Sequence, residues 1–94
     1  MSEEEGKPLS VYTAVVAMAD QMAAIAWQKL GLQPDFMTGK IEPNIAEAKV
    51  AIDVVAHLAG IVDKELDDSD RREMHNLVSN LRLNYVDKAK EATS

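Results

Sequence analysis

Apolar and polar positions alternate with helical spacing along most of the chain, and this pattern predicts three helices. The first, over about 10–30, is apolar around most of its circumference, with its polar positions confined to one narrow stripe. The second, over about 44–66, carries apolar residues at alternating spacings of three and four, which is a heptad pattern. The third, over about 69–90, has one main apolar stripe and further apolar positions beside it. The fold class expected is therefore all-α, a three-helix bundle.

Capping residues mark the expected helix ends. Ser10 suits the N-cap of the first helix, and Gly31 suits the left-handed position just beyond its C-terminus. Asn44 and Glu47 have the spacing of a capping box at the start of the second helix. The acidic segment 67–70 forms the second connection and places negative charge at the start of the third helix, where the helix dipole favours it.

The first connection, over about 32–43, contains proline and glycine, which break helices. It also holds Phe36, Met37 and Ile41, which are unusually apolar for a solvated loop. We expect these three side chains to fold back onto the core.

The surplus of apolar surface predicts self-association. A monomeric three-helix bundle needs one apolar stripe per helix, but each helix here carries more, and a chain of 94 residues has little material to cover it. We expect a homo-oligomer, by default a twofold dimer, that forms through the first two helices. A large charged residue in place of Ala19 or Ala23 is expected to break it. The residues expected at the interface are Val15, Ala19, Met22, Ala23, Ile25, Trp27, Val54 and Leu58.

Composition limits the classes of partner and the cellular compartment that we expect for this protein. The predicted organisation is a disordered acidic tail over 1–9 and a single helical domain over 10–91. The net charge of −6 argues against nucleic acid and anionic membranes as partners, because both favour basic surfaces. The absence of cysteine excludes disulfides and thiolate sites and fits a cytoplasmic protein. We expect no membrane span, because Asp20 interrupts the apolar stretch.

Few residues suggest a catalytic, metal-binding or ligand-binding site, and each of them can also be explained by a structural or surface role. Asp53 and His57 lie one helical turn apart, so both side chains would reach one metal ion or orient one another, but further ligands are lacking. Arg82 lies beside the apolar stripe of the third helix, and we expect it to form a structural ion pair with Asp53; an anion site is the alternative. Asp20 is either a buried carboxylate or part of an exposed polar stripe. We therefore predict no catalytic residues, no metal site and no cofactor.

Short motifs in sequence order resemble a small bacterial family that is classed only as a domain of unknown function, number eighteen-forty-four. The resemblance covers about 9–90 and implies a small cytoplasmic helical protein with no assigned activity. The segment 60–66 departs from the family's usual pattern before the last helix. The matching residues are Leu30 with Gly31, Pro34, Thr38 with Gly39, Asn44 with Ile45, Ala48 with Lys49, Ile52 with Asp53, Leu81 with Arg82, and Tyr85.

Three functions remain open. The favoured hypothesis is a non-catalytic interaction or scaffold module that self-associates. The second is a ligand-binding protein or small enzyme with a pocket between helices, lined by Asp20, Asp53, His57 and Arg82. The third is an obligate subunit of a hetero-complex, in which a different protein chain covers the spare apolar surface.

Overall fold

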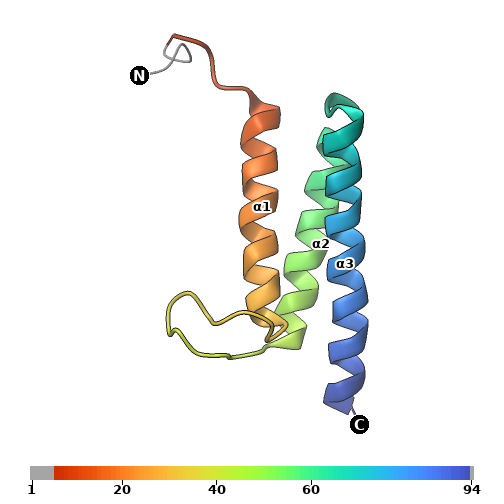
Figure 1. Cartoon of the computed structure of the whole chain (residues 1–94). Coiled ribbons are helices and arrows are strands. Elements are labelled where there is room, and N and C mark those ends of the chain that lie inside the picture. Colours follow the sequence, from red (N-terminus) through yellow and green to blue (C-terminus); the bar gives the residue numbers. More distant parts are fainter. Residues whose placement is uncertain (1–5, 94) are drawn as a thin grey trace.

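The structure is a computed structural model and describes residues 6–93. Over this range the chain forms α1 (Val11–Lys29), α2 (Ile45–Val62), a short 3₁₀ turn η1 (Asp63–Glu65) and α3 (Asp68–Thr93), with no strand (Figure 1). The predicted all-α class and three-helix bundle are confirmed. The first five residues of the expected acidic tail lie outside the described residues.

The ends of α1 follow its capping residues. The side-chain oxygen of Ser10 accepts a hydrogen bond from the backbone N–H of Thr13, at 3.4 Å. Beyond the C-terminus, Gly31 adopts a φ of +82°, and the N–H of Leu32 donates to the carbonyl oxygen of Trp27, at 3.1 Å. A left-handed glycine satisfies the last helical carbonyls in this way, so the predicted C-terminal cap is confirmed.

Both ends of α2 and the start of α3 differ slightly from prediction. Asn44 caps α2 as expected, because its Oδ1 accepts from the N–H of Glu47, at 3.1 Å. The carboxylate of Glu47 does not complete a capping box; it pairs instead with Lys29, at 3.2 Å. The α-helix ends at Val62 rather than near residue 66, and η1 follows. At the start of α3, Asp67 Oδ1 accepts from the N–H of Asp70, at 2.8 Å.

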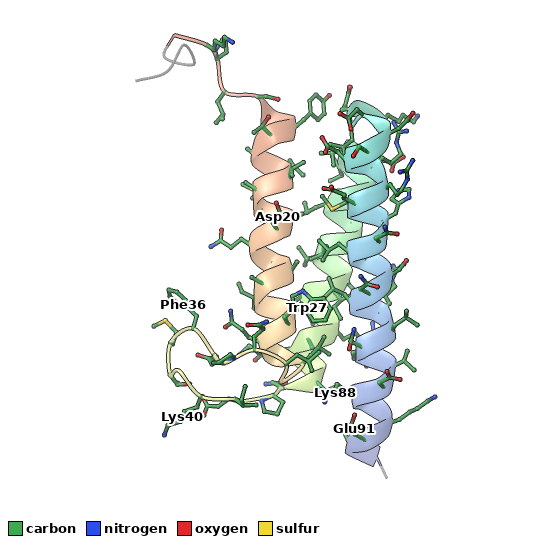
Figure 2. All side chains as sticks on the ribbon, in the orientation of Figure 1. Asp20, Trp27, Phe36, Lys40, Lys88 and Glu91 are labelled. Atoms are coloured by element: carbon green, nitrogen blue, oxygen red, sulfur yellow. The ribbon has the colours of Figure 1, made fainter. Side chains whose placement is uncertain are left out.

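The expectation that the first connection folds onto the core is wrong. Phe36 and Met37 are each 85% exposed, and Ile41 is also exposed. Figure 2 shows Phe36 on the outer side of the loop, away from the helices. The loop is closed by its own polar groups: the N–H of Asp35 donates to the carbonyl oxygen of Lys40, at 2.7 Å, and Asp35 Oδ1 accepts from the N–H of Met37, at 2.8 Å. These bonds hold the loop in a form that turns its apolar side chains outward.

Small residues allow α1 and α2 to pack closely. The buried residues of α1 are all alanines, namely Ala19, Ala23 and Ala26. They join one core cluster with Ile52 and Val55 of α2. Helices whose contact surface is lined by alanine approach one another closely because no long side chain separates their backbones. Ala19 and Ala23 were predicted at a subunit interface, but the structure buries them inside a single chain.

The three helices form an open arrangement. α2 packs against both other helices, whereas α1 and α3 scarcely touch one another; Figure 1 shows α2 between them. The molecule measures 53 × 29 × 18 Å, with a radius of gyration of 15.3 Å. A compact domain of this length would have a radius of gyration of about 12 Å. The helices therefore leave much of their apolar surface uncovered. Among the described residues, no helix has both the length and the hydropathy needed to span a membrane.

Candidate functional site

Two apolar stripes dominate one side of the α1–α2 pair. Their residues are three or four positions apart, so each stripe occupies one side of its helix. Five of the nine side chains are exposed and four are half-buried. We call the two stripes together the apolar face; it consists of Val11, Val15, Met18, Met22 and Ile25 on α1, and Val50, Val54, Leu58 and Ile61 on α2.

An ion pair shows that the two stripes lie side by side. Lys29 follows Ile25 by four residues, and Glu47 precedes Val50 by three, so each continues one stripe by a turn. Lys29 Nζ lies 3.2 Å from Glu47 Oε1. The pair thus joins the ends of the two stripes, which lie on helices that pack against one another. No charged residue lies within either stripe between this pair and the far end.

The eight predicted interface residues fall into three groups in the structure. Five of the eight belong to the apolar face. Ala19 and Ala23 are buried between α1 and α2, at 0% and 4% exposure, so their surface is already used within the chain. Trp27 is half-buried against the core cluster (Figure 2). The prediction of a subunit interface on the first two helices therefore rests on the outer positions Val15, Met22, Ile25, Val54 and Leu58.

A groove between α1 and α3 has a volume of about 630 Å³. Its floor is apolar, with Val16 from α1 and Met74 and Leu77 from α3. Asp20 lies exposed at this groove, so the alternative of a buried carboxylate is wrong. We call it the acidic groove, because its other charged lining residues are also carboxylates: Glu65, Asp70 and Glu73.

The expected ion pair between Asp53 and Arg82 is not formed. Both residues line one hollow of about 240 Å³ between α2 and α3. Asp53 instead pairs with Lys49 one turn earlier on its own helix, with Lys49 Nζ 3.0 Å from Asp53 Oδ2. This hydrogen bond and the charge of the carboxylate raise the pKa of Lys49 above its ordinary value. The local pairing satisfies Asp53 without bringing in a residue of another helix.

The inter-helix pocket proposed for a ligand is not assembled. Asp20 lies at the acidic groove, whereas Asp53 and Arg82 line a different hollow. His57 is exposed and lines neither of these hollows. Within the described residues, no group of three or more His, Asp or Glu side chains is placed to hold a metal ion. These residues therefore form no shared catalytic or ligating constellation.

A polar cluster at the α2–α3 turn was missed by the sequence analysis. Arg71 donates from Nε to the carbonyl oxygen of Asp63 and from Nη2 to that of Leu66, at 2.9 and 2.8 Å. Its Nη1 also pairs with Asp68, at 2.9 Å. His75 Nε2 lies 2.6 Å from Asp63 Oδ1. Helical spacing does not predict these contacts to Asp63, because they cross from η1 to α3.

Comparison with known proteins assigns the chain to a family. The family model described as "Domain of unknown function (DUF1844)" matches residues 12–87. The chain belongs to this family. No curated protein and no solved structure matches it. The DUF1844 match includes all of α2 and most of α1 and α3, so the resemblance carried by the short motifs is confirmed. Membership in DUF1844 brings no assigned activity.

Proposed function

We propose that this DUF1844 chain is a non-catalytic interaction module that self-associates through the apolar face. The observation that carries the proposal is the uninterrupted apolar character of this surface. Nine apolar side chains cover it, and charge appears only in the Lys29–Glu47 pair at its end. An exposed, contiguous apolar patch on a small protein marks an interaction site.

A second copy is the partner that this surface fits best. The chain has a net charge of −6, so two copies repel one another over most of their surface. The apolar face is the broad surface through which two copies can make contact without bringing like charges together. In a twofold dimer the same patch is used on both subunits, which requires a surface that is complementary to itself.

The size of the apolar face is adequate for such a contact. Together with Lys29 at its end, the α1 stripe runs the full 19 residues of the helix, and this length corresponds to about 28 Å at the usual helical rise of about 1.5 Å per residue. The surface is two helices wide, or about 20 Å across. The flat area given by this length and width is smaller than the roughly 800 Å² that each partner buries in an ordinary stable interface. It approaches that value when the uneven surface of the side chains is counted.

We propose further that the module works in the bacterial cytoplasm. The cysteine-free sequence is compatible with a reducing compartment.

The test is the mass of the protein in solution, measured by size-exclusion chromatography with light scattering over a range of concentrations. We expect the wild type to show twice the chain mass of 10.3 kDa. Met18→Glu and Val50→Glu should each give a single-chain mass, because a symmetric interface would bury the new charge twice. Both side chains are exposed within one chain, at 58% and 63%, so the fold should tolerate the change.

The matched control is Leu83→Glu. Leu83 is 64% exposed but lies on α3, outside the apolar face. This variant should keep the wild-type mass. A wild type that stays monomeric at every concentration, or a Met18→Glu variant that keeps the wild-type mass, would overturn the proposal.

A further inference from the structure

The acidic groove has the geometry of an incomplete helical bundle. α1 and α3 both pack on α2 but scarcely touch one another, and Figure 1 shows them on either side of it. The hollow between them, about 630 Å³, is bordered by Asp20 and Val16 on α1 and by residues 70–77 on α3. Four-helix bundles place a fourth helix at such a position, in contact with two neighbours.

The floor of the groove would bury apolar side chains of that helix. Met74 is buried, and Val16, Leu66 and Leu77 are half-buried and line the hollow. Tyr12 adds an exposed aromatic ring near the end of α1. An amphipathic helix binds such a groove through apolar residues spaced three or four apart.

The rim determines the charge of the occupant. Asp20, Glu65, Asp70 and Glu73 are exposed and line the hollow, and no lysine, arginine or histidine does so. None of these four carboxylates forms an ion pair with another described residue. A cationic helix would supply the missing counter-charges. A second copy of this chain, with a net charge of −6, complements the rim poorly.

The groove and the apolar face use different sides of α1. Val16 and Asp20 are one turn apart and line the groove, whereas Val15 and Met22 belong to the apolar face. Occupation of one surface therefore leaves the other free. Binding at the groove does not depend on self-association.

We propose that the acidic groove binds a cationic amphipathic helix of another protein, which completes a four-helix bundle with α1, α2 and α3. The apolar side of that helix covers the floor residues Val16, Met74 and Leu77. Its lysine or arginine residues pair with the carboxylates of the rim. The proposal adds a second surface with a different class of partner to the self-association proposed above.

The test uses a defined probe, a fluorescein-labelled helical peptide of about 18 residues, or five turns. It carries leucine at spacings of three and four and lysine elsewhere; a matched peptide carries glutamate in place of every lysine. Binding to the full chain is followed by fluorescence anisotropy. We expect the lysine peptide to bind and the glutamate peptide not to bind. Equal binding of the two peptides would contradict the proposal.

Two double variants locate the binding site. Asp70→Asn with Glu73→Gln removes two rim charges and should weaken binding of the lysine peptide about tenfold, which two interfacial ion pairs together can supply. Glu42→Gln with Asp87→Asn makes the same change in net charge at exposed positions that line none of the hollows described above. This control should bind like the wild type. Equal losses in the two double variants would mean non-specific attraction and would overturn the proposal.

Two further measurements distinguish binding of a helix from binding of a small cation. Leu77→Gln leaves the charge unchanged but removes apolar surface from the floor, so it should also weaken the lysine peptide; its circular dichroism melt checks that the fold is kept. Spermine is a small polycation without an apolar side, so it cannot cover the apolar side chains of the groove floor. It should therefore bind at least about a hundredfold more weakly than the peptide. Tight spermine binding that is insensitive to Leu77→Gln would overturn the proposal in favour of a small-cation site.

Discussion

Arg71 is the residue that holds the α2–α3 turn together. Its guanidinium donates to the backbone carbonyls of Asp63 and Leu66, and it also pairs with the carboxylate of Asp68. These carbonyls lie where regular helix stops, so few helical N–H groups are available to them. A single planar side chain with several donors can satisfy them together.

We therefore expect Arg71→Met to lower the free energy of unfolding by about 1–3 kcal/mol, the usual cost when partly buried polar groups lose their partners. The measurement is urea denaturation followed by circular dichroism at a fixed protein concentration. Arg72→Met is the matched control, because Arg72 is exposed and has no ion pair among the described residues; it should change stability by less than about 0.5 kcal/mol. Equal effects of the two variants would show that the turn does not depend on Arg71.

Residue-scale pairings were the least predictable from the sequence. Asp53 was expected to pair with Arg82, but it pairs with Lys49. Both partners are plausible by residue type, and the choice depends on which one the backbone brings within reach. Phe36 and Met37 illustrate the same limit, since composition favoured burial and the hydrogen bonds of Asp35 turned the loop outward.

At the scale of the element, the distance between α1 and α2 depends on small side chains. Ala26 of α1 and Ala48 of α2 are each 0% exposed. A larger side chain at such a position has no free volume to occupy, so the helices must separate or adopt strained rotamers. Contacts of this kind explain why nearly all the buried surface of α1 faces α2.

Ala26→Leu should therefore destabilise the chain by about 1–3 kcal/mol. Ala24→Leu is the control on the same helix, because Ala24 is exposed and leucine is almost as good a helix former as alanine. Thermal unfolding followed by circular dichroism compares the two. If Ala26→Leu melts at the temperature of the control, the close contact between α1 and α2 is wrong.

Helix positions and their ends were largely predictable, because they depend on local signals. Ser10, Gly31 and Asn44 each occupy the capping position that their chemistry favours. The main deviation is the end of α2 at Val62, where the chain tightens into η1 before the turn. A heptad pattern that continues to Leu66 does not show this change, because Leu66 still packs against the core from its position after η1.

At the scale of the whole molecule, charge and apolar surface act in opposite directions. Each copy carries a net charge of −6, so electrostatic repulsion opposes self-association, whereas the apolar face favours it. Repulsion extends over about 30 Å at 0.01 M salt but only about 8 Å at 0.15 M. The apolar contact itself depends little on salt in this range.

Self-association should therefore strengthen as salt is raised between these concentrations, whereas binding of the lysine peptide to the acidic groove should weaken. Analytical ultracentrifugation measures the first trend and fluorescence anisotropy the second. The opposite directions follow from like charges in one case and opposite charges in the other. A dimer that dissociates as salt is raised would indicate that its contact is an ionic one and does not involve the apolar face.

The sequence by itself determined which segments are helical, where the caps lie, and that the chain carries more apolar surface than three helices need. These properties depend on neighbours within a few residues, which the sequence displays directly. The tertiary structure alone decided that Ala19 and Ala23 pack within the chain, that Asp20 borders a groove with three other carboxylates, and that Arg71 spans the α2–α3 turn. Such contacts join residues distant in sequence, and they depend on how the helices pack around α2, which helical periodicity does not specify.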